Sequence, residues 1–144
     1  MEHALRKNAE SIHDQLAAFA AELEMRLQKA VPTFPKLSSI QGEVLIFRNG
    51  DWNKASSLEL EVRPSVGVLS VKFINTHPDL RRNPDDRTGS SVVGAIESLA
   101  REKGYRRIYA HRVLPESGGF WEKLDFRMAP EMTGVNPHYV KNLS

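Results

Sequence analysis

The run Val68-Leu69-Ser70-Val71-Lys72-Phe73-Ile74-Asn75 decides the fold, together with the later run Arg87-Thr88-Gly89-Ser90-Ser91. The first run is apolar and is typical of a strand. In the second run, Thr88 is the expected N-cap of a helix over residues 88 to 103, because apolar side chains then recur at helical spacing until Gly104. The charged residues between the two runs predict a loop. A strand, a loop and a helix therefore follow one another directly.

The Gly-Ser turn that opens this helix is suited to binding an anion. The first backbone N–H groups of a helix have no partner inside it, and the helix dipole adds partial positive charge where they point. A phosphate is favoured there, and Arg82 and Arg87 are the best placed cations in the sequence. The alternative is an ordinary helix start that binds nothing.

The rest of the chain predicts further strands and helices around this unit. Apolar and charged residues alternate at 58 to 63, which indicates an antiparallel strand with one wet face, and a turn at 64 to 67 leads into the return strand. Other strands are expected at 43 to 47, at 106 to 112, from 126 and at 139 to 140, with a short helix at 120 to 124. This order predicts an α/β (α+β) fold with a mixed sheet flanked by helices.

An amphipathic helix is expected over residues 3 to 30, because apolar side chains recur there four and three residues apart. Pro32 and Pro35 end it, and a linker follows. We divide the chain into residues 1–35, which form this helix and its proline linker, and residues 36–144, which form the main domain. The apolar stripe is expected to pack on the main domain. A homodimer seam and a surface for another protein are the alternatives.

Composition limits the class of protein. A chain of 144 residues with 40% hydrophobic and 26% charged residues has the size and make-up of one globular domain. The absence of cysteine excludes disulfides, thiolate zinc sites and cysteine nucleophiles, and five dispersed histidines indicate no metal site. No apolar run reaches the roughly 18 residues of a membrane span, so we expect a soluble, cytoplasmic protein. A net charge of +2 argues against nucleic acid as a partner.

Three segments in order resemble the signature segments of the GNAT superfamily of acyl-CoA-dependent N-acyltransferases. They are His77-Pro78-Asp79-Leu80-Arg81, then Arg87-Thr88-Gly89-Ser90-Ser91, and then Phe120-Trp121-Glu122-Lys123-Leu124-Asp125-Phe126. The resemblance spans residues 41 to 143 and leaves residues 1 to 35 unmatched. It implies a GNAT-like, mostly antiparallel sheet flanked by helices over residues 36–144, with the long N-terminal helix as an addition.

The resemblance also implies a site for acetyl-CoA or another acyl-CoA. The family holds the CoA pyrophosphate on a glycine turn at a helix start, and the matching window here runs from Asp86 to Ser91. The implied pyrophosphate contacts are Arg82, Arg87, Thr88, Gly89, Ser90 and Ser91. In the family, backbone N–H groups at the end of the preceding strand polarise the thioester carbonyl. By order these groups belong to Ile74, Asn75 or Thr76.

Proton transfer is the step at which this chain departs from the family pattern. Trp121 stands where the family often has a tyrosine acid, and an indole N–H is no acid at neutral pH. Leu114, Asp125 and Val68 likewise replace a family asparagine, a glycine and the acidic residue of some members. The candidate catalytic positions are Glu61, His77 and Trp121, and His111 is a further histidine at a strand end. Each of these residues also has a purely structural interpretation.

Two functions follow from the sequence. The first is an N-acetyltransferase, or a transferase of another short acyl group, that moves the group from acyl-CoA to a primary amine by direct attack. The acceptor is a small molecule or a protein. The alternative is a catalytically degenerate GNAT-fold module that binds a protein partner through the N-terminal helix. Binding of nucleic acid by the basic residues between Arg81 and Arg112 is a weaker third interpretation.

Overall fold

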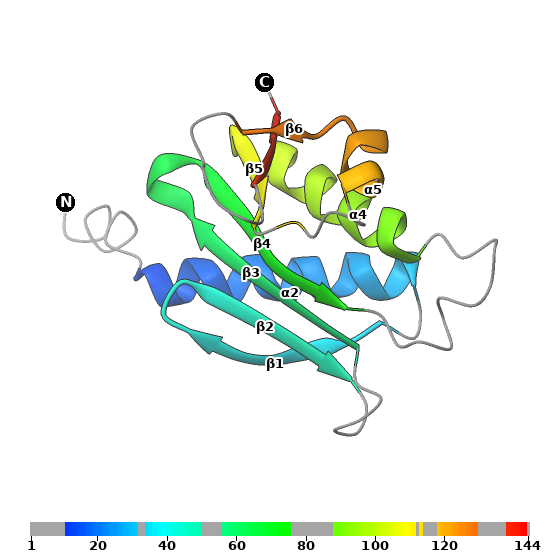
Figure 1. Ribbon diagram of the computed structural model, residues 1–144. Coiled ribbons are helices and arrows are strands. Elements are labelled where there is room, and N and C mark those ends of the chain that lie inside the picture. The colour runs from blue at the N-terminus through cyan, green and yellow to red at the C-terminus, as the bar shows by residue number, and fades with distance from the viewer. Residues whose placement is uncertain are drawn as a thin grey trace.

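A computed structural model describes residues 11–31, 34–49, 56–75, 88–111, 113, 118–129 and 138–143 (Figure 1). These residues build one sheet in the order β1-β2-β3-β4-β5-β7-β6. The strands are β1 (Lys36–Gln41), β2 (Val44–Asn49), β3 (Ser56–Arg63), β4 (Val68–Asn75), β5 (Arg107–Ala110), β6 (Arg127–Met128) and β7 (Tyr139–Asn142). Neighbours are antiparallel except β4 and β5, which run parallel. The expected mixed, mostly antiparallel sheet with helices is confirmed.

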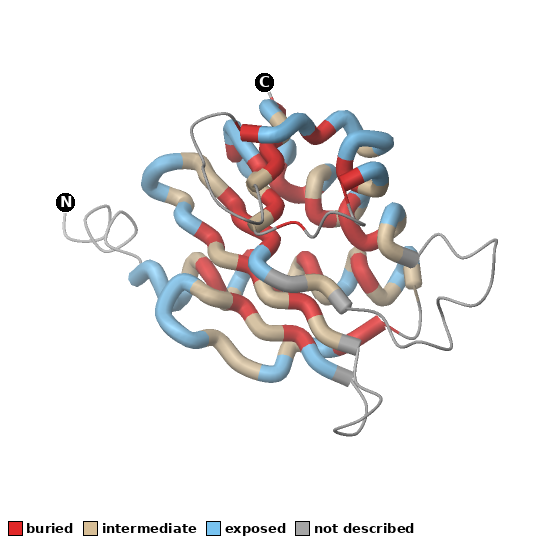
Figure 2. The backbone as a smooth tube through the Cα atoms, viewed as in Figure 1, coloured by how far each residue is buried: buried red, intermediate tan, exposed pale blue. Residues whose placement is uncertain are grey.

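Among the described residues, three α-helices and one 3-10 turn accompany the sheet. They are α2 (Ile12–Ala30), η1 (Pro64–Val66), α4 (Thr88–Glu102) and α5 (Gly118–Lys123). Buried side chains alternate along β2 and β3 with half-exposed ones, so one face of the sheet lies in the core (Figure 2). Among the described residues, no helix is both long enough and apolar enough to cross a membrane.

The N-terminal helix is part of the core. Its buried residues Leu16, Phe19, Leu23 and Leu27 join the same cluster as the sheet and α4. Each large apolar side chain buried in this way stabilises the fold by about 1.5–3 kcal/mol. The expectation that this stripe packs on its own domain is therefore confirmed for Leu16, Phe19 and Leu23, whereas Ile12 is exposed.

The start of that helix corrects the expected boundary. Ser11 is extended and its hydroxyl accepts the Asp14 N–H at 3.1 Å, so the helix begins at Ile12 rather than near residue 3. A serine at this place satisfies an otherwise unpartnered N–H group, and this local bond sets the boundary. Leu5 and Ala9 lie outside the described residues.

Strand β1 occupies part of what the sequence predicted as a linker. Leu37 and Ile40 are its only large apolar residues, which is too few for a recognisable strand pattern. The strand forms because β2 lies beside it across a turn in which Gly42 has φ +60°. The Leu37 N–H also donates to the Glu24 carboxylate of α2 at 2.6 Å. Tertiary partners therefore decide this strand.

The parallel pair β4 and β5 fixes where α4 begins. A helix that connects two adjacent parallel strands must run back antiparallel to them. The first turn of α4 therefore lies at the carboxyl end of β4, and its last turn lies near the amino ends of β4 and β5 (Figure 1). The order of strand, helix and strand predicted from residues 68 to 112 is confirmed, but Thr88, the expected N-cap, is instead the first residue of the helix.

The last turn of α4 is closed by local hydrogen bonds. Gly104 has φ +82°, and its N–H donates to the Arg101 carbonyl oxygen while the Tyr105 N–H donates to that of Ala100. This Schellman arrangement needs a residue that tolerates the left-handed region. Gly67 has φ +69° at the start of β4, and its carbonyl oxygen accepts the Arg106 N–H at 2.7 Å. The amino ends of β4 and β5 are therefore tied together.

An ion-paired cluster joins α4 to the last strand. Lys141 Nζ lies 2.9 Å from Glu97 Oε1 and donates to the Leu124 carbonyl oxygen at 2.9 Å, and Arg101 also pairs with Glu97. Partial burial alone would raise the pKa of Glu97. The hydrogen bonds and charges of Lys141 and Arg101 outweigh burial and lower that pKa below its ordinary value.

Candidate acyl-CoA site at the end of β4

Strand β4 is paired on both sides only in its first half. Val68 to Val71 lie opposite β3 on one edge and opposite Arg107–Ala110 of β5 on the other. The ladder to β5 ends where the His111 N–H donates to the Val71 carbonyl oxygen at 3.0 Å. Beyond Val71, no other strand of the described residues pairs with this edge of β4. The described pairing of the two parallel strands therefore ends at Val71, and we call this side of residues 72–75 the parted edge.

A β-bulge lies directly after this point. Leu60 of β3 is opposite Val71 and the adjacent Glu59 is opposite Phe73, so Lys72 is an extra residue in β4. Because of the extra residue, the core face passes from Leu69 and Val71 to Ile74. The sequence did not reveal the bulge, since Leu69, Val71 and Phe73 alternate with Ser70 and Lys72 without a break.

The bulge also determines which backbone amide of β4 points to the parted edge. Backbone groups of alternate residues point to the same edge of a strand, and Val71 points to β5. Without the bulge, Phe73 would be the next residue whose backbone groups point to this edge. The extra residue makes Ile74 that residue instead. We infer from this register that the Ile74 N–H is directed toward the parted edge.

The start of α4 lies at the same end of the sheet as this edge. Its first residue, Thr88, is followed by the half-buried Gly89, the exposed Ser90 and the half-buried Ser91. A Cβ atom at Gly89 would lie 3.1 and 3.2 Å from two ring atoms of Phe120 in α5. Packing against Phe120 therefore favours glycine at this position, whether or not a ligand binds there.

Trp121 lies inside an aromatic cluster. It is 4% exposed, and its ring meets those of Phe120 and Phe126 edge to face at centroid distances of 5.1 and 5.0 Å. Such contacts stabilise a core. The next turn explains a further departure from the family pattern, because Asp125 has φ +67°, a conformation that suits glycine and that aspartate tolerates.

Glu61 lies on the face of β3 opposite the buried Leu60 and Val62. Its carboxylate contacts Arg63 Nε at 2.9 Å and Lys72 Nζ at 3.6 Å. It faces Ser70 across the β3–β4 ladder, before the point where β4 and β5 part. The carboxylate is therefore engaged by two cations.

Of the other predicted site residues, Ile74 is half-buried on the core and Asn75 ends β4. His77, Thr76, Arg82 and Arg87 lie outside the described residues. Within the described residues, no group of three histidine, aspartate or glutamate side chains could hold a metal ion.

A pair of histidines escaped the sequence analysis. The rings of His111 and His138 meet edge to face with centroids 4.5 Å apart, although the two residues are far apart in the chain. The chain returns from β6 to β7 beside β5, which brings them together. His138 precedes the short strand predicted at 139 to 140, and nothing in its local sequence indicated the contact.

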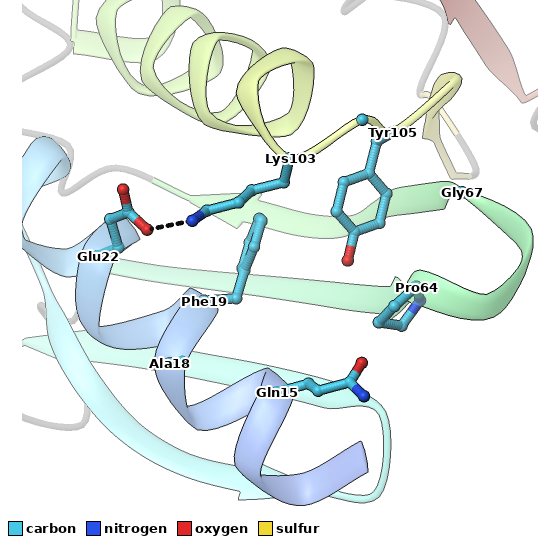
Figure 3. A pocket seen from close by; sticks show the side chains of 9 residues that line it. Gln15, Ala18, Phe19, Glu22, Pro64, Gly67, Lys103 and Tyr105 are labelled. Atoms are coloured by element: carbon cyan, nitrogen blue, oxygen red, sulfur yellow. Dashed lines mark ion pairs between the residues drawn. The ribbon is translucent and has the colours of Figure 1, made fainter. Parts of the chain in front are cut away.

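A pocket of about 350 Å³ lies at the opposite, tied end of β4 (Figure 3). It is lined by residues of α2, the η1 turn and the end of α4, among them Phe19, Pro64 and Tyr105. Lys103 and Glu22 form an ion pair of 3.0 Å at its edge. Burial raises the pKa of Tyr105 to about 12, so its hydroxyl remains protonated at neutral pH.

Solved structures of known proteins share this fold. GCN5 of Tetrahymena aligns with a TM-score of 0.57 at 8% identity, over 89% of this chain and 88% of that one. The ribosomal-protein-S18-alanine N-acetyltransferase of Escherichia coli aligns with a TM-score of 0.54 at 13% identity, over 87% and 86%. An aminoglycoside 6'-N-acetyltransferase in complex with coenzyme A aligns with a TM-score of 0.52 at 11% identity, over 87% and 91%. No protein-family model and no curated protein sequence matches the chain.

Proposed function

This chain has the fold of the GNAT superfamily, and on that premise we propose that it transfers an acetyl or other short acyl group from acyl-CoA to a primary amine. The single observation that carries the proposal is the end of the described β4–β5 pairing at Val71, followed by a bulge at Lys72. At this point a thioester could lie beside the Ile74 amide of β4, close to the first turn of α4.

In this proposal the pyrophosphate of CoA binds at the first turn of α4. The amides of Thr88, Gly89, Ser90 and Ser91 belong to the part of the helix that lacks internal acceptors. The helix dipole favours negative charge there, and Arg82 and Arg87 would add cations from the preceding segment. The coenzyme A complex of a protein with the same fold supports this cofactor class.

The thioester would lie along the second half of β4. The Ile74 N–H is directed to the parted edge, and Asn75 and Thr76 follow it in the chain. A fixed N–H donor near a carbonyl stabilises the negative charge that develops when an amine attacks. Direct attack needs no nucleophile from the protein, which fits a chain without cysteine. The lack of cysteine also fits a reducing, cytoplasmic setting.

Calorimetry and a thiol-release assay test the proposal. Full-length protein is titrated with acetyl-CoA, and release of free CoA thiol is then followed with n-butylamine, spermidine and an alanine-terminated peptide as separate acceptors. We expect binding of one acetyl-CoA per chain and amine-dependent thiol release. Absence of acetyl-CoA binding at high protein concentration would contradict the proposal.

The second candidate is a GNAT-fold module without transferase activity. The burial of Trp121 favours it, because this residue occupies the position of the family's tyrosine acid and packs in an aromatic core. Such a module would use the outer face of α2, where Met25 and Ile12 are exposed, toward a protein or a second copy. Acetyl-CoA binding without thiol release for any amine would favour this second function.

A further inference from the structure

The histidine pair lies where β4 and β5 part. His111 directly follows β5, and its backbone N–H makes the last bond to Val71. Ala110 is buried in the core, so the alternation of β5 places the His111 side chain on the opposite face of the sheet, beside Tyr109. The His111 ring is therefore near the beginning of the parted edge.

His138 contacts the His111 ring, and a backbone hydrogen bond fixes its position. Its carbonyl oxygen accepts the Ala129 N–H at 2.9 Å, and it directly precedes β7, which pairs with β5. Its Nδ1 atom is buried and has no hydrogen-bond partner among the described residues. A buried polar atom left in this state costs about 1–3 kcal/mol, and in native proteins such atoms need an explanation, of which a role in catalysis is one.

Two other candidate residues, Glu61 and Trp121, are less suited to take the proton. The Glu61 carboxylate is paired with Arg63 and Lys72, and Trp121 is buried in the aromatic cluster with no acidic proton to give. Among the described residues at the parted edge, His111 and His138 carry imidazole rings, the side-chain type that most often serves as a general acid or base.

We propose that His111 accepts the proton of the acceptor ammonium group and that His138 is the positioning residue that holds its ring. This inference rests on the acyl transfer proposed above. An ammonium R–NH3+ gives one proton to the His111 imidazole and becomes the amine R–NH2. The nitrogen lone pair then forms the C–N bond to the thioester carbon, and the C–S bond breaks with its electron pair on sulfur. A second proton leaves nitrogen and ends on the CoA thiol, and the imidazolium returns its proton to water.

The arrangement fits this division of roles. The carbonyl would meet the amide of Ile74 on the edge of β4, while the amine would approach from the face on which His111 lies, opposite α2 and α4. The two rings meet edge to face at 62°, so His138 packs directly against the His111 ring.

Four single variants, with His111→Ala added below for chemical rescue, test this proposal in the full chain. They are His111→Gln, His138→Gln, His138→Phe and, as the matched control, His13→Gln, which changes an exposed histidine of α2. For each variant we measure the acetyl-CoA dissociation constant by calorimetry and kcat/KM for the best of the three amines above. His111→Gln is expected to lower kcat/KM about 100-fold or more, with the dissociation constant changed less than twofold. His13→Gln should behave as the wild type.

The two changes at His138 separate positioning from packing. His138→Phe keeps an aromatic ring and removes the buried nitrogen, so the melting temperature should hold or rise while turnover falls about tenfold. His138→Gln should lower turnover by a similar factor. The defect of His111→Gln should shrink as the pH approaches the pKa of the acceptor amine, because the amine then needs no base. Added imidazole should partly rescue a His111→Ala variant.

Each outcome decides something distinct. Normal turnover in His111→Gln, with acetyl-CoA binding intact, would overturn the role of the pair and leave the acyltransferase function standing. Failure of the wild type to bind acetyl-CoA or to release thiol with any amine would remove both. A lowered turnover that neither high pH nor imidazole restores would assign His111 a structural role only.

Discussion

Both halves of β4 pair with β3 on one edge, but only the first half pairs with a described strand on the other edge. Residues 68 to 71 pair with β3 and β5, and the turn at Gly67 and the cap at Gly104 tie this end together. Residues 72 to 75 contain the bulge and pair with β3 only, among the described strands. One strand therefore stabilises the core with its first half and leaves backbone groups available with its second half.

Residues 68 to 71, the closed half of β4, should contribute more to the stability of the fold than residues 72 to 75, the open half. Leu69→Ala removes a fully buried side chain and should lower the free energy of unfolding by about 2–5 kcal/mol. Ile74→Ala acts on a half-buried residue of the open half and should cost about 1–2 kcal/mol. Urea unfolding followed by circular dichroism measures both. Equal losses would remove the energetic difference between the halves.

Deletion of Lys72 should close the open half. Without this residue, Leu69, Val71 and Ile74 alternate in a regular strand, so the core face is kept while the bulge is lost. Bulges increase local twist, and a regular β4 should continue beside β5. Thiol release should fall about 100-fold with little change in melting temperature. A folded deletion variant with wild-type turnover would show that the bulge has no part in the reaction.

Two glycines of α4 form a matched pair. Gly94→Ala adds a methyl group where nothing lies within 4 Å and should raise the free energy of unfolding by up to about 1 kcal/mol. Gly89→Ala presses on the Phe120 ring and should give no such gain, and acetyl-CoA should bind about tenfold more weakly. Thermal unfolding and calorimetry measure the two effects. In the double variant Gly89→Ala, Phe120→Leu, the smaller side chain at residue 120 should restore the free energy of unfolding. If the affinity for acetyl-CoA does not recover with it, Gly89 has a role in binding that is separate from its packing.

The ion-paired cluster behind β5 should give the smallest effect, which is a pH dependence. The folded pKa of Glu97 is below its ordinary value of 4.5, so its stabilising contribution is present above that pH and is lost as the pH falls through the folded pKa. Lys141→Met removes the partner and should flatten the decline of unfolding free energy on the acid side. Urea unfolding between pH 3 and pH 6 measures this slope. An unchanged slope in Lys141→Met would contradict the assignment.

Much of the central unit could be predicted because its signals are local. The apolar run at 68 to 75, the helix between Thr88 and Gly104 and the alternation at 58 to 63 each report on neighbours in the chain. Strand β1 could not be predicted, because Leu37 and Ile40 form a strand only once β2 and the Glu24 carboxylate are in place. The helix start at Ile12 required the hydrogen bond of Ser11.

The candidate site was partly visible in the sequence for the same reason. The turn at Gly89 and the strand end at Ile74 belong to one continuous stretch, whereas His111 and His138 meet only through the pairing of β5 with β7. The bulge at Lys72 left no break in the apolar alternation of β4, because it is defined only by the register of β4 against β3. Contacts between distant segments are the part that local patterns do not specify.

The most direct test compares the two ends of β4 in one NMR titration. Backbone amide signals of the full chain are followed while acetyl-CoA is added to saturation. The account predicts shifts of the Ile74 amide and of the Gly89 to Ser91 amides, with the Gly67 and Tyr105 amides unchanged. Shifts confined to Gly67, Tyr105 and their neighbours, or no shifts at Ile74 and Gly89, would contradict it.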